Sequence, residues 1–134
     1  AGVLLDPEVD FKNRPAEMTR LLQLFEGAKY GLGFTTFGRV AFHPTFPWPE
    51  SAGFGWGSPQ LYTVSPESAR KGIAEWRERW SVVIPSVPAF GRNSDAQLLP
   101  YLRELGDVPG LCVWQWALLA PDEWRQLAEF ARRF

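Results

Sequence analysis

Two carboxylates stand two positions apart near the start of the chain, where the apolar run 3–5 leads into Asp6-Pro7-Glu8. Residues i and i+2 of a strand point to the same side, about 7 Å apart along it. Two neighbouring carboxylates resist ionising together, so one tends to keep its proton at neutral pH. The pair can therefore supply a general acid and a charged partner. In the alternative interpretation, Asp6-Pro7 begins a turn, and Glu8 and Asp10 are solvated loop residues or charges that lead into a helix.

Amide and aromatic side chains follow at the ends of later strands. Gln60 and Tyr62 end a predicted strand over 58–65, and Trp114 and Trp116 share one face of a predicted strand over 110–119. Indole and phenol rings present flat, half-polar surfaces suited to ligands. The alternatives are that Tyr62 is a core tyrosine with a satisfied hydroxyl and that one of the two tryptophans belongs to the core.

The connection 38–58 is rich in proline and aromatic residues. A connection of this length without a clear helix is typical of a functional or disordered segment, and this one is too aromatic for disorder. Its rings either form a wall over a binding cleft or fold inwards in place of a helix. Inward folding is the favoured interpretation for most of them, and Trp48 and Trp56 are the best candidates for exposure.

The sequence contains no motif that is typical of a metal or cofactor site. His43 is the only histidine, and beside Pro44 it predicts a hydrogen-bonded loop residue unless carboxylates converge on it. Cys112 lies in an apolar run, which is typical of a small core residue. No glycine-rich phosphate loop follows a predicted strand. We therefore expect neither a metal nor a cofactor.

Strands and helices alternate along the chain. Continuous apolar runs predict strands over 2–9, 30–38, 58–65, 81–91 and 110–119. Between them, apolar residues at helical spacing predict helices over 18–28 and from Ser65-Pro66 to Trp80, then a helix that stops at Gly106 and a last one from Pro121. This alternation is typical of a parallel sheet with helical crossovers.

The fold class that these elements predict is α/β, as part of a TIM-type barrel. A complete (β/α)8 barrel needs eight units and about 250 residues, whereas this chain has five units in 134 residues. We therefore expect residues 1–134 to be a single domain that corresponds to strands four to eight. Polar residues at the strand ends would then meet at one mouth of the barrel. Besides those named above, they include Thr35, Thr36, Ser86 and Gln115.

The composition argues against nucleic acid and a membrane span as partners of the chain. The formal net charge is −1, so no basic field for nucleic acid is present, and no apolar run is as long as a membrane span. One cysteine excludes an internal disulfide framework. The sequence opens with Ala1, so we expect that a preceding segment was removed or left out. Open sheet edges predict pairing with the missing N-terminal half of the barrel or with a second copy of the chain.

The order of four short motifs resembles a known group of enzymes. The stretches LLDPEVDF (4–11), FHPTFPW (42–48), PQLY (59–62) and VWQWALL (113–119) resemble the D-x-E barrel glycoside hydrolases, meaning the family 25 lysozymes and, more distantly, the family 18 chitinase-like proteins. The similarity is greatest to hydrolase-like barrel domains of phage lysins and tail proteins. It covers most of the chain. Pro7 departs from the family pattern, and so does the absence of the first-strand aspartate that the lysozymes use.

The resemblance implies roles for individual residues. Glu8 would be the proton donor and Asp6 its electrostatic partner, with the substrate's acetamido group as nucleophile in substrate-assisted variants. Tyr62 would face the scissile sugar, Trp114 would form the floor beneath it and Trp116 would lie nearer the rim. The substrate would be peptidoglycan or a chitin-like glycan, and the location extracellular or on a virion.

Two classes of function remain open from the sequence. The first is a glycosidase acting on cell-wall glycan, or its C-terminal part, which the clustered carboxylates and the mouth-facing rings favour. The second is a non-catalytic glycan-binding or structural barrel module. Pro7 and the missing strands favour the second class for this chain. The complete reading frame would discriminate between them, because a hydrolase of the lysozyme type needs an acidic residue at the end of its first strand.

Overall fold

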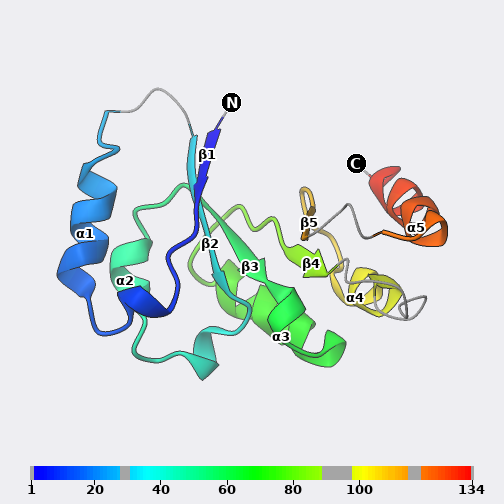
Figure 1. The fold of residues 1–134 in the computed structure, drawn as a ribbon, viewed down its shortest axis with the longest axis horizontal. Coiled ribbons are helices and arrows are strands. Elements are labelled where there is room, and N and C mark those ends of the chain that lie inside the picture. Colours follow the sequence, from blue (N-terminus) through cyan, green and yellow to red (C-terminus); the bar gives the residue numbers. More distant parts are fainter. Residues whose placement is uncertain (1, 28–30, 89–97, 115–118, 134) are drawn as a thin grey trace.

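The computed structural model describes residues 2–27, 31–88, 98–114 and 119–133, and its fold is α/β. Within these residues, five strands form one all-parallel sheet in the order β1-β2-β3-β4-β5, which curls into half of a barrel (Figure 1). The strands are β1 (Gly2–Leu5), β2 (Gly31–Phe37), β3 (Trp56–Gln60), β4 (Ser86–Pro88) and β5 (Cys112–Trp114). The predicted sheet topology is therefore confirmed.

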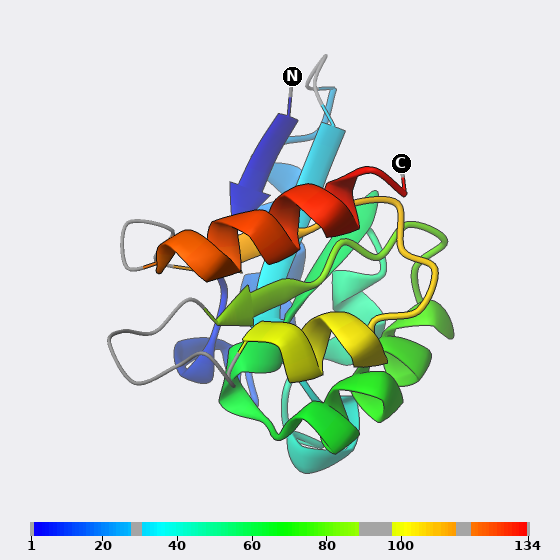
Figure 2. The same ribbon diagram turned by 90° about the vertical axis from the view of Figure 1, so that its right-hand side faces the viewer.

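Helices alternate with the strands. They are α1 (Pro15–Gln23), α2 (Trp48–Ser51), α3 (Pro66–Arg77), α4 (Leu98–Glu104) and α5 (Pro121–Ala131), with 3-10 turns η1 (Val9–Phe11), η2 (Val40–Phe42) and η3 (Leu61–Thr63). Helices α3 and α4 lie side by side, and α5 packs next to α4 (Figures 1 and 2). The Ser65 side chain caps α3 by accepting a hydrogen bond from the Ser68 amide, as the sequence predicts.

The face of the sheet that meets the helices is apolar. Phe34 of β2 is fully buried and packs against Phe54, Trp76 and Trp80, with ring centroids 4.7, 5.0 and 4.9 Å away. Trp76 and Trp80 belong to the apolar stripe of the helix predicted from Ser65-Pro66 to Trp80, and their burial confirms this stripe, although α3 itself ends at Arg77. These large rings fix the position of β2 and β3 against α3.

The opposite, concave face of the sheet carries small and polar side chains. Side chains alternate between the two faces of a strand, and registered partners on parallel strands share a face. On the face opposite Phe34, this places side chains from all five strands, in the pairs Leu4↔Gly33, Thr35↔Ser58, Gln60↔Ser86 and Ser86↔Cys112. The carboxyl end of this concave face holds the candidate site.

Several predicted strands are shorter in the structure. The first was predicted over 2–9 but ends at Leu5, because Pro7 has no amide hydrogen for the ladder. The third was predicted over 58–65, yet it occupies 56–60 and turns into η3, where Thr63 Oγ1 donates to the Gln60 carbonyl at 2.7 Å. Of the fourth run, predicted over 81–91, β4 occupies Ser86–Pro88, and 89–91 lie outside the described residues.

The aromatic connection 38–58 contains the short helix α2, so the expectation of a segment without a helix was wrong in this detail. Most of its rings fold inwards, as predicted: Phe46, Trp48 and Phe54 are buried, whereas Phe42 is 61% exposed. Trp48 was predicted to be exposed, and this prediction was wrong, because its side chain is only 6% exposed. Its indole Nε1 donates to the His43 carbonyl at 2.9 Å, which satisfies the polar atom of a buried ring.

Candidate functional site

Strand β1 delivers the carboxylate pair to the carboxyl end of the sheet. Asp6 and Glu8 follow the strand in the connection to η1, and Asp6 is exposed while Glu8 is half-buried. Gln60, the last residue of β3, donates from Nε2 to Asp6 Oδ1 at 2.8 Å. Although Asp6 is accessible to solvent, the surrounding side chains displace part of the hydration of its carboxyl, and this desolvation raises its pKa. The negative charge of Glu8 raises the same pKa further, whereas the hydrogen bond from the Gln60 amide lowers it. The two carboxyls therefore interact, as the sequence predicts.

Tyr62 and Trp114 bring two aromatic rings to the carboxylates. Tyr62 lies in η3 directly after β3, and its ring stacks on that of Trp114 with centroids 6.0 Å apart and an interplanar angle of 19°. Burial raises the pKa of Tyr62 to about 12, and the charges of Asp6 and Glu8 contribute to this shift. The Tyr62 hydroxyl therefore keeps its proton at neutral pH, next to two acidic groups.

A cavity of about 120 Å³ joins these residues on the concave face. Its walls come from β1, β2, β4, β5 and η3: they are formed by Leu4, Asp6, Thr35, Tyr62, Ser86, Cys112, Val113 and Trp114. Polar groups line one side, since Thr35 Oγ1 donates to the Ser58 carbonyl at 2.8 Å and the Ser58 and Ser86 hydroxyls lie 2.8 Å apart. The arrangement can hold a small, partly polar group between a carboxyl and an aromatic ring.

The cavity contains several of the residues that the sequence predicts for the site, together with others that it does not. Asp6, Tyr62 and Trp114 meet at the cavity, and Trp114 is 50% exposed beside it. Thr35 and Ser86 line the cavity, whereas Thr36 is buried on the opposite face. Leu4 was not singled out and Cys112 was read as core. Leu4 lies two residues before Asp6, and Cys112 lies two residues before Trp114. Because side chains alternate along a strand, this spacing predicts that each shares a face with the site residue that follows it.

Trp48 and Trp56, which the sequence also singled out, do not line this cavity. Trp48 lies in the core beside α3, as described above. Trp56, at the start of β3, is half-buried and covers Gly33 at the amino end of the strands, where a Cβ on Gly33 would come within 2.1 Å of the indole. Trp116 and Gln115 lie outside the described residues.

His43 is a packed loop residue. Its ring stacks on Phe37 at 3.7 Å between centroids, and the Lys12 ammonium lies 4.9 Å from the centroid of the same Phe37 ring. Burial lowers the pKa of His43, and the positive charge of Lys12 lowers it further. Among the residues that the structure describes, no group of three His, Cys, Asp or Glu side chains is placed to hold a metal ion.

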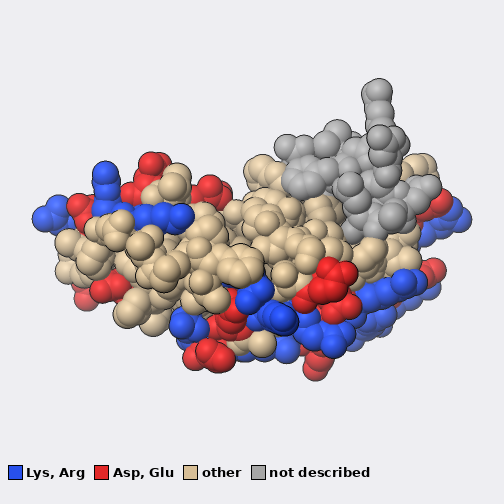
Figure 3. Space-filling model, turned by 90° about the horizontal axis from the view of Figure 1, so that it is seen from below, with Lys and Arg blue, Asp and Glu red and all other residues tan. Residues whose placement is uncertain are grey.

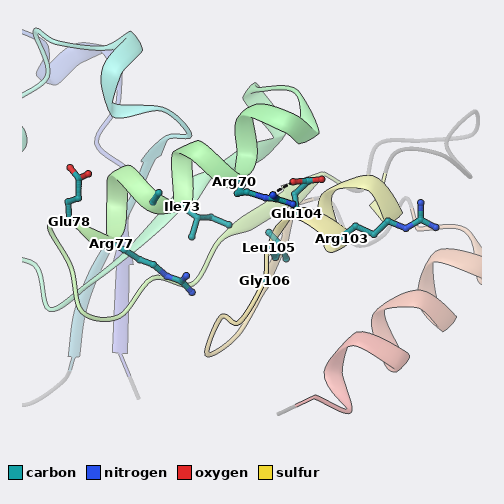
Figure 4. A pocket seen from close by; sticks show the side chains of 9 residues that line it. Arg70, Ile73, Arg77, Glu78, Arg103, Glu104, Leu105 and Gly106 are labelled. Carbon is teal, nitrogen blue, oxygen red and sulfur yellow. Dashed lines mark ion pairs between the residues drawn. The ribbon is translucent and has the colours of Figure 1, made fainter.

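A larger groove, of about 540 Å³, lies between α3 and α4 on the helical side (Figure 4). Ile73 and Leu105 contribute apolar surface, and Arg70 Nε forms an ion pair with Glu104 Oε2 at 2.9 Å. Arg77 donates to the Asp107 carbonyl, and the Arg103 side chain points away from the groove. Its size exceeds that of the cavity beside Asp6, but Arg70 and Glu104 are paired with each other and Arg77 is bonded to a backbone carbonyl. We therefore place the candidate site at the carboxylates.

The face drawn in Figure 3 shows no field of one sign. Lys and Arg side chains lie along its lower edge and at its left, interspersed with Asp and Glu, and uncharged residues occupy the middle of the view. A surface of this kind gives no long-range attraction to a polyanion or a polycation. No helix within the described ranges has the length and apolar character needed to cross a bilayer.

Comparisons with known proteins give no relative for this chain: no protein-family model, no curated protein and no solved structure matches it.

Proposed function

We propose that this chain is the C-terminal part of a TIM-type glycoside-hydrolase-like barrel, and that the mouth formed by Asp6, Glu8, Tyr62 and Trp114 binds cell-wall glycan. The observation that carries the proposal is the convergence of a carboxyl, a tyrosine and an exposed, stacked tryptophan on one small cavity. Sugar rings present apolar faces to indoles and hydroxyl groups to carboxylates, so this combination of side chains suits a neutral saccharide.

The size of the cavity favours a glycan with small substituents. At about 120 Å³ it is far below the roughly 300–1,000 Å³ of pockets that enclose a drug-sized ligand. We infer that one substituent, such as the N-acetyl group of peptidoglycan and chitin, enters the cavity. The sugar rings would lie outside it against Trp114.

In the reaction that we propose, Glu8 donates a proton to the leaving glycosidic oxygen and Asp6 stays charged beside it. An acid and a charged partner are the pair that glycoside hydrolysis requires. Tyr62, which keeps its proton, donates a hydrogen bond to the substrate. The N-acetyl group supplies the nucleophile in the substrate-assisted form of the reaction.

A second candidate function is a non-catalytic glycan-binding module. It is favoured by the open concave face, on which Trp114 is half exposed and Asp6 is accessible to solvent. In this case the same mouth binds the same glycan without cleaving it, so both candidates share one binding test.

The test is a binding titration of N-acetylglucosamine oligomers and soluble peptidoglycan fragments by calorimetry. Trp114→Ala should weaken binding several-fold, because a ring contact of this kind is worth roughly 1 kcal/mol. Trp124→Ala is the matched control, since Trp124 on α5 is 48% exposed and lies outside the cavity. Equal affinity of the two variants and the parent, or no binding by the parent, would overturn the proposal.

A further inference from the structure

Gln60 is buried at the point where β3 ends. Its side chain is only 2% exposed, and its backbone is registered with Phe37 on one side and Ser86 on the other. A side chain so covered has little surface left for a substrate. Its observed contact is with a carboxylate, the 2.8 Å hydrogen bond from Nε2 to Asp6 Oδ1.

The direction of this hydrogen bond favours one protonation state. An amide nitrogen donates to a carboxylate oxygen and so stabilises the charged carboxylate. Burial and the neighbouring Glu8 both act in the opposite sense on Asp6. The other titratable groups at this site, Tyr62 and Cys112, line the same cavity, and neither adds a positive charge at neutral pH.

We propose that Gln60 is a positioning residue: its buried amide fixes the orientation of the Asp6 carboxyl and stabilises the charged form of that group. A role of Gln60 in catalysis rests on the function proposed above. The hydrogen bond to Asp6 and its effect on that carboxyl do not depend on that function. The backbone of Gln60 is held in place by its neighbour in sequence, because Thr63 Oγ1 donates to the Gln60 carbonyl at 2.7 Å. Gln60 therefore acts through Asp6 and not on the substrate.

The test is a carboxyl-carbon NMR titration of the protein, which needs no glycan and no turnover. Gln60→Met keeps the length of the side chain and removes the donor, so the titration midpoint of Asp6 should move to higher pH. Thr63→Val is the matched control, because it removes a hydrogen bond to the same residue without touching the amide. An Asp6 midpoint that is equal in the parent and in Gln60→Met, or that moves equally in Thr63→Val, would overturn the proposal.

A second measurement keeps the proposal testable if Gln60→Met fails to fold. In the parent protein, the Gln60 side-chain amide protons should shift with the same midpoint as the Asp6 carboxyl. The Asp6→Asn variant should abolish this shift. An amide signal that does not change across the titration of Asp6 would contradict the inference, whatever the result of the glycan-binding experiment.

Discussion

The charges of Asp6 and Glu8 interact with the phenol of Tyr62, so removing one of these charges should change the pKa of Tyr62. Burial of the phenol raises the pKa of Tyr62 to about 12, and the negative charges of Asp6 and Glu8 beside it contribute to this rise. We therefore expect Asp6→Asn to lower the pKa of Tyr62, as measured by NMR titration of the tyrosine ring carbons. Tyr101 is the internal control, since Glu67 and not Asp6 contributes to its raised pKa. An unchanged Tyr62 in the variant would contradict the coupling.

The raised pKa of Tyr62 also implies that the stability of the fold depends on pH. In the unfolded chain a tyrosine ionises near pH 10, whereas Tyr62 in the fold holds its proton to about pH 12. Between these values the folded state binds more protons than the unfolded state, so the free energy of unfolding should fall as pH rises from 10 to 12. Tyr62→Phe should show a smaller fall than the parent in denaturant titrations over this range. Parallel pH profiles for the two proteins would count against it.

Glu8 is the residue to which we assign the proton in catalysis. In a barrel completed by its N-terminal units, Glu8→Gln should reduce glycan turnover by a factor on the order of a hundred or more, with binding nearly unchanged. Asp10→Asn is the matched control, because this exposed carboxylate lies only two residues further on in η1. If Glu8→Gln cleaves as fast as the parent, the assignment of the acid is wrong.

At the scale of residues, the sequence predicted the pairing of carboxylates but not the full environment of each. The spacing of Asp6 and Glu8 is visible in the sequence, and so is their place after an apolar run. That Gln60 bonds to Asp6 depends on the register between strands that lie 54 positions apart in the chain. Such a contact follows from sheet geometry and not from local pattern, so it emerges only in the structure.

At the scale of elements, α3 is fixed by a very close approach to the end of β2. A Cβ on Gly72 would lie 2.2 Å from the Gly38 carbonyl oxygen, which is backbone and cannot move aside cheaply. Gly72→Ala should therefore lower the free energy of unfolding by about 2 kcal/mol, the typical cost of overpacking. This is the opposite of the gain that helix propensity alone predicts.

The control for this variant is Lys71→Ala, at an exposed position of the same helix. An exposed substitution of this kind usually changes stability by less than about 0.5 kcal/mol. Chemical denaturation followed by tryptophan fluorescence measures both variants. A stabilised Gly72→Ala would show that α3 can move away from β2.

Element types were easier to predict than element ends. The cap at Ser65 and the proline after it locate the start of α3, and Gly106 (φ 64°) follows Leu105 just beyond the end of α4. The strand ends were harder, because Tyr62 and Thr63 favour β structure by type but form a 3-10 turn. The burial of Trp48 depends on α3 packing over the loop, which no local pattern encodes.

At the scale of the whole molecule, the two outer strands have one neighbour each in the described part of the chain. Leu4 of β1 is 41% exposed, and an unpaired, apolar edge favours association with another strand. We expect the chain to associate with itself or with an added N-terminal peptide in a concentration-dependent manner. Light scattering that shows a monomer at all concentrations without such a peptide would contradict this.

A charge at the edge provides the control. Leu4→Lys should reduce association, because lysine on an edge strand disfavours pairing with another chain. Leu24→Lys adds the same charge at an exposed position directly after α1 and outside the sheet, and should leave association unchanged. If both variants associate as the parent does, the contact does not use β1.

The claim that the carboxyl end of the sheet is a glycan site is tested most directly by mapping NMR shifts on adding an N-acetylglucosamine oligomer. We predict that the largest changes occur at the Trp114 indole, the Tyr62 ring and the side chains of Asp6 and Glu8, which surround or adjoin the 120 Å³ cavity. Ile73 and Leu105, in the groove between α3 and α4, should not shift. Changes confined to that groove, or no changes at all with either this oligomer or a soluble peptidoglycan fragment, would contradict the account.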